Sequence, residues 1–75
     1  MISALQLRVK KGWPQSELAR RAKVGIHTVR RWEQGRPVRR SIAEKLSQAL
    51  GTELDNLSGV SVYNAVQTHN KKALE

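Results

Sequence analysis

Between Gln15 and Gly35 the chain reads QSELARRAKVGIHTVRRWEQG, and the spacing of the apolar residues in this stretch decides the fold. At about 100° per residue, these residues form one stripe on a helix over about 15–22 and another on a helix over about 26–34. The inward positions are Leu18, Ala19 and Ala22 on the first helix, Val24 in the turn, and Val29 and Trp32 on the second. Because helices this short are marginal alone in water, we expect both stripes to pack into a common core.

The outer face of the second helix carries almost only hydrogen-bond donors. The residues within about 140° of arc on that face are Ile26, His27, Arg30, Arg31 and Gln34. A cationic ridge of this width fits the major groove of double-stranded DNA.

Length and composition bound what else the chain can be. Seventy-five residues suit one domain with a small core, which buries about 60% of the surface that the unfolded chain exposes. The chain has no cysteine, so we expect neither disulfides nor thiolate metal sites. No apolar run approaches the roughly 18 residues that cross a bilayer, and the first residues lack the order of a signal peptide. We therefore expect a cytoplasmic protein without a membrane segment.

The charge is unevenly distributed along the chain. Residues 1–40 hold eleven lysines or arginines and two glutamates, a net charge of +9, whereas residues 41–75 hold three basic and four acidic residues, a net charge of −1. A basic half beside a near-neutral half is typical of a face that binds a polyanion. The alternatives are a solvated basic surface without a partner and a basic helix on a membrane. The membrane alternative is disfavoured because Trp13 and Trp32 lie among residues needed for the core.

Residues on either side of the central stretch predict further structure. A helix over 3–11 carries Leu5, Arg8 and Val9 among polar neighbours and stops before a break at 12–14. Gly35 is expected to cap the helix over 26–34 in the left-handed conformation. The segment that follows is expected to be an extended loop up to residue 40, because a proline at position 37 disfavours helix for the residue before it.

Two capping signals predict the remaining helices. Ser41 with Glu44 forms a capping box that opens a helix ending at Gly51. Thr52 with Asp55 repeats the signal and predicts a last helical turn.

No strand pattern appears in residues 1–58. The sequence therefore predicts an all-α fold. We expect a compact five-helix domain over 1–58 with a central helix-turn-helix, followed by a tail over 59–75.

Motifs within these helices carry a resemblance to a known family. They are Gln15 with Glu17-Leu18-Ala19, Val24 in the turn, Val29, Trp32-Glu33-Gln34-Gly35, and Ala49-Leu50-Gly51. At this spacing they resemble the Cro/C1-type helix-turn-helix family of repressors and regulators, over about residues 2–58. The resemblance implies a lambda-repressor-like five-helix domain that inserts its third helix into the major groove, usually as a homodimer on a palindromic operator.

Three positions depart from the family pattern, and none of them touches the proposed groove face. Lys23 stands where the turn usually has glycine, so we expect a non-glycine residue in the left-handed conformation at a cost of roughly 1–2 kcal/mol. Gly25 replaces the usual Ser or Thr that caps the recognition helix, and it is a slightly weaker cap. Pro14 precedes Gln15, so the helix starts either near Gln15 or at Pro14, where a missing N–H is harmless.

The resemblance assigns base contacts to the starts of the second and third helices. Gln15 matches a glutamine that clamps a phosphate and lies near the first bases. Ile26, His27 and Arg31 match positions that reach base edges. Arg31 can pair bidentately with guanine, and Ile26 can pack on a thymine methyl group. Arg30 faces nearly the same way and is assigned either a base contact or a backbone contact.

Further contacts to the DNA backbone are expected around the loop after the recognition helix. Arginine grips phosphates bidentately, and such contacts fix the register without reading sequence. Ser41 contributes either a backbone N–H to a phosphate or only a helix cap. The expected phosphate contacts are Lys10, Gln15, Gln34, Arg36, Arg39, Arg40 and Ser41.

Arg8 and Glu33 occupy positions that the family often joins in a largely buried ion pair. We therefore assign Glu33 a structural role in the fold rather than a chemical role at a functional site. Removing one partner of a buried pair typically costs about 3–5 kcal/mol, because the other charge is stranded.

The tail over 59–75 has two interpretations. Its valines alternate loosely as in a strand, but Val62, Val66 and His69 also share a helix face. We expect an ordered segment near 60–67 that serves in dimerisation, with disorder as the alternative. His69 on its own is not a metal site.

The sequence gives no support for catalysis. His27 and His69 have no partner carboxylate at a useful spacing, and there is no glycine-rich phosphate loop. No metal, cofactor or small-molecule ligand is expected. The function indicated is that of a sequence-specific transcriptional regulator, a repressor, bound to double-stranded DNA.

Two other kinds of binding are the alternatives. One is an antitoxin or adaptor that engages a partner protein through its tail, with autoregulatory DNA binding. The other is RNA binding, which is disfavoured because both tryptophans and Tyr63 are poorly placed for base stacking.

Overall fold

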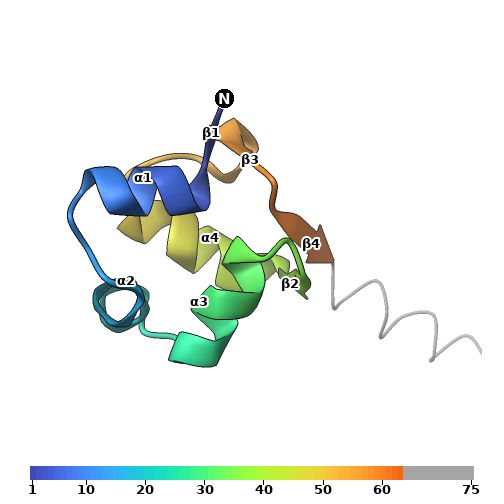
Figure 1. Cartoon of the computed structure of the whole chain (residues 1–75). Coiled ribbons are helices and arrows are strands. Elements are labelled where there is room, and N and C mark those ends of the chain that lie inside the picture. The colour runs from blue at the N-terminus through green and yellow to red at the C-terminus, as the bar shows by residue number, and fades with distance from the viewer. Residues whose placement is uncertain (64–75) are drawn as a thin grey trace, which may run out of the picture.

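The computed structural model describes residues 1–63, which form four α-helices, one turn of 3-10 helix and four short strands (Figure 1). The helices are α1 (Ala4–Lys10), α2 (Gln15–Ala22), α3 (Ile26–Glu33), α4 (Arg40–Ala49) and the 3-10 turn η1 (Leu54–Asn56). The strands are β1 (Ile2–Ser3), β2 (Pro37–Arg39), β3 (Leu57–Ser58) and β4 (Ser61–Tyr63). The two central helices are confirmed to within one residue, but the expected fifth helix is only the turn η1.

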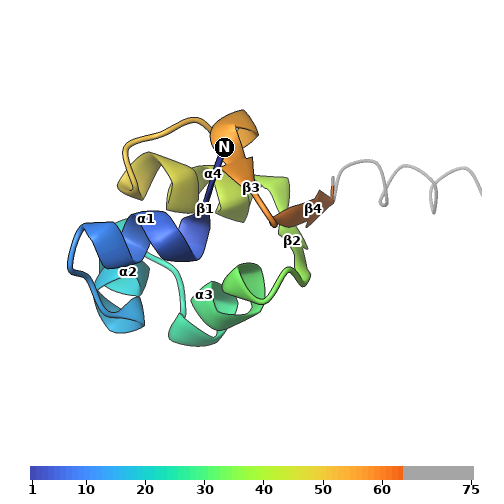
Figure 2. The ribbon, with the colours of Figure 1, turned by 45° about the horizontal axis from the view of Figure 1, so that its top comes forward.

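The structure also contains two pairs of short parallel strands, three of whose members lie in residues 1–58, where no strand was expected; the fourth, in the tail, agrees with the strand interpretation of Val62. β1 pairs with β3, which places Ile2 opposite Leu57, and β2 pairs with β4, which places Val38 opposite Val62 (Figure 2). Strands of two or three residues are too short to show a period-2 pattern, and their partners are distant in sequence. The fold is therefore mainly helical, with strand pieces that tie residues 57–63 to the helices.

Each α-helix within residues 1–63 is followed, one or two residues after its last residue, by a residue in the left-handed conformation. These residues are Gly12, Lys23, Gly35 and Gly51, with φ angles of 75°, 59°, 84° and 78°. After α2 the N–H of Val24 donates to the carbonyl of Ala19 at 3.0 Å, which closes the turn before α3. The predicted conformations of Lys23 and Gly35 are thus confirmed, and only Lys23 carries a Cβ atom in this region.

The start of α4 differs from the predicted capping box. Its N-cap is Arg39, the last residue of β2, and no side chain caps it. The predicted Ser41–Glu44 capping box is therefore wrong. The pairing of β2 with β4 fixes the backbone through Arg39, and α4 begins at the next residue. A capping box forms at α1 instead, where Ser3 Oγ accepts from the Gln6 N–H and the Gln6 side chain accepts from the Ser3 N–H, both at 3.1 Å.

Two further helix starts are settled by the backbone. Pro14 is the N-cap of α2, so that helix starts at Gln15 rather than at Pro14. The predicted Thr52–Asp55 cap is wrong, because the N-cap of η1 is Glu53 and no side chain caps this turn. The N–H of Thr52 instead donates to the carbonyl of Ser47 at 3.0 Å, which ties Thr52 to the end of α4.

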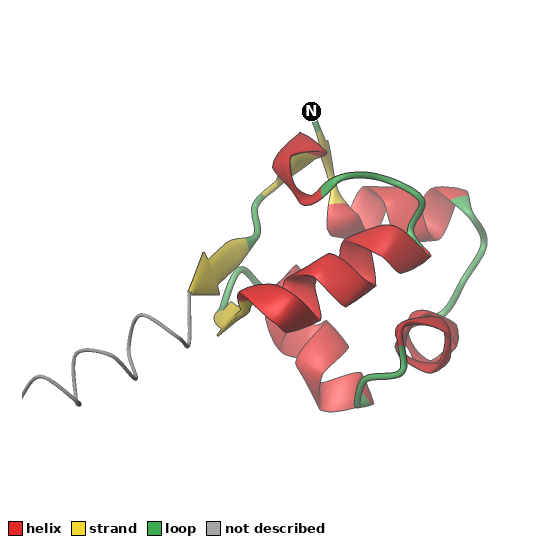
Figure 3. Cartoon of the chain, turned by 180° about the vertical axis from the view of Figure 1, so that it is seen from behind, coloured by secondary structure: helices red, strands yellow, loops and turns green. Residues whose placement is uncertain are grey.

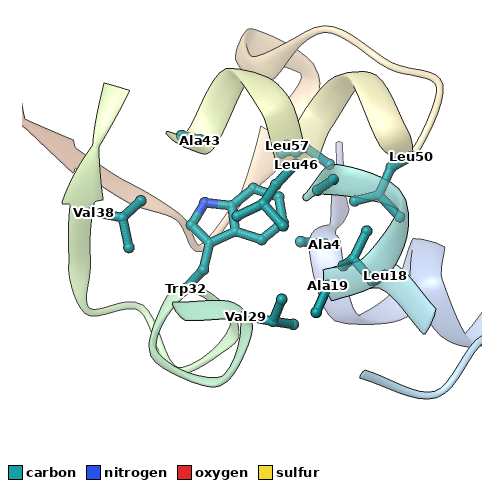
Figure 4. Close-up of a cluster of buried hydrophobic side chains, with 11 residues drawn as sticks. Ala4, Leu18, Ala19, Val29, Trp32, Val38, Ala43, Leu46, Leu50 and Leu57 are labelled. Atoms are coloured by element: carbon teal, nitrogen blue, oxygen red, sulfur yellow. The ribbon is translucent and has the colours of Figure 1, made fainter. Parts of the chain in front are cut away.

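Trp32 of α3 lies at the centre of the core. Its side chain is fully buried, and Figure 4 shows the indole between Val38 of β2 and Ala43 and Leu46 of α4. Within residues 1–63 its buried Nε1 has no hydrogen-bond partner. The predicted inward positions are confirmed, since all are buried except Val24, which is partly buried against the same core.

The helices enclose this core unequally. α4 lies across the others when the domain is seen from behind (Figure 3), and it contacts α2, β2 and η1. α1 buries Ala4 and Arg8 but leaves Leu5 44% and Val9 61% exposed. α3 lies on the side of the domain away from the N-terminus (Figures 1 and 2). Among the described residues, no helix is long and apolar enough to cross a membrane.

Candidate nucleic-acid interface

The outer face of α3 is exposed and basic. His27, Arg30 and Arg31 are exposed, whereas Ile26 is half-buried and packs against the core. Gly25 caps the helix as expected, with extended backbone at φ −73° and ψ 152° and no side-chain hydrogen bond. This face of α3 therefore presents three exposed polar side chains and part of the apolar side chain of Ile26.

The segment after α3 adds further exposed polar residues. They are Gln34, Arg36, Arg39, Arg40 and Ser41. In β2 the side chain of Val38 is buried while its two neighbours are exposed, so the alternation of the strand turns Arg39 outward. Lys10, the remaining predicted phosphate contact, is exposed at the end of α1, on a different element.

The charges of this region are mostly unneutralised. The two glutamates of residues 1–40 are already paired, Glu33 with Arg8 and Glu17 with Arg20 and Arg21. Arg40 Nε lies 3.4 Å from Glu44 Oε2, in a pair that is half exposed. The arginines of α3 and the following segment that form no ion pair within residues 1–63 are Arg30, Arg31, Arg36 and Arg39.

Local contacts hold the basic side chains in the last turn of α2 and in the loop before this helix. Hydrogen bonds from Arg20, and then from Arg21, lower the pKa of Glu17 below its ordinary value of 4.5. The Arg21 guanidinium also lies 4.2 Å from the centre of the Trp13 ring, and Lys11 Nζ lies 5.2 Å from it. These contacts fix the loop that leads from α1 into α2.

A buried ion pair joins α1 to the end of α3. Arg8 Nε donates to Glu33 Oε2 at 2.5 Å, and Arg8 Nη2 donates to Glu33 Oε1 at 3.1 Å. The two side chains are only 11% and 5% exposed. Arg8 Nη1 also donates to the carbonyl of Trp13 at 2.7 Å, so the same guanidinium holds the loop before α2. The two residues thus lie where the family resemblance pairs them.

Gln15 connects this ion pair to the surface of α3. Its Nε2 donates to Glu33 Oε1 at 2.9 Å, and its Oε1 accepts from Arg30 Nε at 3.4 Å. The sequence predicts DNA contacts for Gln15 and Arg30 and an interior position for Glu33, but it does not indicate that the three residues are joined. No local signal could have found these contacts, because they span 18 and 15 residues and form only when α2 packs on α3.

Three acidic residues lie near one another around α4 and η1. Glu44, Glu53 and Asp55 line a shallow hollow between α4 and η1. In the part of the chain that the structure describes, no group of three His, Cys, Asp or Glu residues could hold a metal ion.

Comparison with known proteins agrees with this geometry. The family model of helix-turn-helix proteins matches residues 5–57, and the chain belongs to this Cro/C1-type helix-turn-helix family. Neither a curated protein nor a solved structure matches the chain. The family is one of DNA-binding regulators and not a family of enzymes.

Proposed function

We propose that the chain is a sequence-specific transcriptional regulator that inserts α3 into the major groove of double-stranded DNA. The observation that carries this proposal is the exposed outer face of α3. Its two arginines, Arg30 and Arg31, form no ion pair within residues 1–63, and neither do Arg36 and Arg39 of the segment after it. The major groove is wide enough for an α-helix and exposes acceptors that distinguish the base pairs.

The proposed contacts are of two kinds, those that recognise bases and those that bind phosphates. His27 and Arg31 donate to base edges, and the exposed part of Ile26 packs on a thymine methyl group. Gln15 and Arg30 lie where α2 meets α3 and contact either a base edge or the backbone. The proposed phosphate contacts are Lys10, Gln34, Arg36, Arg39, Arg40 and Ser41.

The proposed regulator acts in the cytoplasm as a homodimeric repressor on a palindromic operator. Support for a dimer comes from β4, which pairs with β2 on one edge and has no strand on its other edge within residues 1–63. Tyr63, at the end of β4, is 45% exposed. The expected dimerisation segment near 60–67 includes this strand, but its residues beyond 63 lie outside the described part of the chain. His69 also lies outside the described residues.

Selection of bound duplexes from a random pool tests the sequence-specific and dimeric parts of the proposal together. We expect a motif with two inverted half-sites, spaced by about one helical turn or a multiple of it. A single short motif would contradict the homodimer and would favour a partner protein in its place. Recovery of no motif would contradict sequence-specific binding.

Salt dependence tests whether the basic residues meet phosphates. With about six phosphate contacts per subunit, the logarithm of affinity should fall against the logarithm of salt concentration with a slope of around −5. A slope near zero would overturn nucleic-acid binding of any kind.

A further inference from the structure

A continuous chain of hydrogen bonds runs from the core to the outer face of α3. It begins at the buried Arg8, passes through the carboxylate of Glu33 and the amide of Gln15, and ends at the exposed Arg30. The last residue lies on the face proposed to meet DNA. The chain therefore joins an interior ion pair to a residue of the proposed interface.

The two partners of Gln15 determine which way its amide points. The N–H donates to a carboxylate, and the carbonyl oxygen accepts from a guanidinium. A reversed amide would place the oxygen against the Glu33 carboxylate and the NH₂ group against the N–H of Arg30. Both contacts would be repulsive, so the charges at the two ends assign a single orientation.

Glu33 is itself held in place. Its side chain is only 5% exposed, and both carboxylate oxygens accept from Arg8. Because Arg8 is also fixed to the Trp13 carbonyl, the carboxylate has little freedom to turn. The orientation of the Gln15 amide therefore originates in the core.

At the surface, this orientation leaves donors in place for DNA. The bond to Gln15 uses the Nε–H of Arg30 and leaves both of its terminal amino groups without a partner within residues 1–63. These groups match a pair of acceptors, either on a guanine edge or on a phosphate.

We propose that Glu33 is a positioning residue for DNA binding, which acts by holding Gln15 so that Gln15 aligns the Arg30 guanidinium before DNA arrives. This inference rests on the proposed function. An aligned side chain loses less conformational freedom on binding. The cost of immobilising one such side chain corresponds to about three- to tenfold in affinity.

The first test uses the protein without DNA. Gln15→Met removes both hydrogen bonds but leaves the Arg8–Glu33 pair intact, so the domain should fold. In NMR spectra we expect the Arg30 Nε–H resonance to shift and to exchange faster with water, while the Arg8 Nε–H resonance stays protected. Gln48→Met on the exposed face of α4 is the matched control and should change neither resonance. An unchanged Arg30 resonance in Gln15→Met would overturn the proposal.

The second test measures affinity for a duplex that carries the selected site. Glu33→Gln replaces the carboxylate by an amide that can donate to Gln15, so the Gln15 amide should reverse and repel Arg30. At a temperature where both proteins are folded, we expect Glu33→Gln to lose about three- to tenfold in affinity. In a background that already carries Arg30→Met, the same change should have no effect. An equal loss in both backgrounds would assign Glu33 a purely structural role and overturn the proposal.

The DNA used in the second test also shows which acceptors Arg30 meets. If Arg30→Met relaxes preference at one base pair, the acceptors are on a base, and if it weakens selected and random duplexes equally, they are phosphates. Both patterns support the alignment, provided that the effect of Glu33→Gln depends on Arg30. Failure of the wild-type protein to bind any duplex would instead refute the proposed function, whatever the NMR result.

Discussion

Arg8 on α1 and Glu33 at the end of α3 are 25 residues apart in sequence and share two hydrogen bonds, of 2.5 and 3.1 Å. Because both side chains are nearly buried, each neutralises a charge that would otherwise be stranded in the core. The pair therefore holds the first and third helices together.

Removing either partner of this pair should bring the domain close to unfolding. We expect Arg8→Ala or Glu33→Ala to cost about 3–5 kcal/mol of unfolding free energy, in a domain whose total is near the low end of the usual range of about 5–15 kcal/mol. The double variant should cost clearly less than the sum, because it strands no charge. Thermal melts of the four proteins give the coupling. Small and strictly additive losses would contradict a buried pair.

Replacing Lys23 by glycine should raise the stability of the domain rather than lower it. Its φ of 59° carries a penalty of roughly 1–2 kcal/mol for a residue with a Cβ atom, and the greater freedom of glycine in the unfolded chain offsets part of the relief. We expect Lys23→Gly to raise the unfolding free energy by about 0.5–1 kcal/mol and the melting temperature by a few degrees. Lys23→Ala removes the same charge but keeps the Cβ atom, so this control should show no gain. Equal effects of the two changes would attribute the result to charge.

Substitutions at Arg31 and Arg39 should distinguish contacts that recognise bases from contacts that bind phosphates. Arg31→Ala should cost about 1–3 kcal/mol on the selected site and relax preference at one base pair. Arg39→Ala should weaken binding to selected and random duplexes alike and reduce the salt slope by about one. Both residues are exposed and form no ion pair within residues 1–63, so neither change should unfold the domain. A change of base preference with Arg39→Ala alone would mean that α3 does not lie in the groove as proposed.

Glu17 should make a pH-dependent contribution to stability. Because Arg20 and Arg21 lower its pKa in the folded protein, its contribution is fully present above the ordinary value of 4.5 and is lost as the pH falls through the lowered pKa. The difference in melting temperature between wild type and Glu17→Gln should therefore be largest at neutral pH and shrink in acid. Glu53→Gln, at an exposed glutamate without an ion pair within residues 1–63, is the control. A difference that is the same at every pH would contradict the contribution assigned to Glu17.

The sequence allowed most of the helical part of the fold to be predicted, because its signals are local. The bounds of α2 and α3 and the burial of Trp32 follow from spacing within one or two turns. The Ser3–Gln6 capping box has the same kind of signal and could have been found by the rule that was applied at Ser41. The left-handed conformation of Lys23 was expected from the family resemblance, which places it where the turn usually has glycine.

The features that were missed depend on contacts between distant residues. The pairing of Val38 with Val62 sets where α4 begins, and it overrides a good local signal at Ser41. The bonds from Gln15 to Glu33 and Arg30 likewise exist only after the helices have packed. Sequence spacing placed the candidate site residues on faces, but it could not show which of them hold one another.

The position of Trp32 has a consequence for how the domain can meet DNA. The indole belongs to the same helix as His27 and Arg31, but it lies in the core beside β2 and α4. A rigid ring with only two rotatable bonds resists tilting of the helix that carries it. The packing of Trp32 in the core thus sets the orientation of α3. A change in the volume of the core residues around Trp32 would change the direction of the exposed face of α3 without altering any residue on that face.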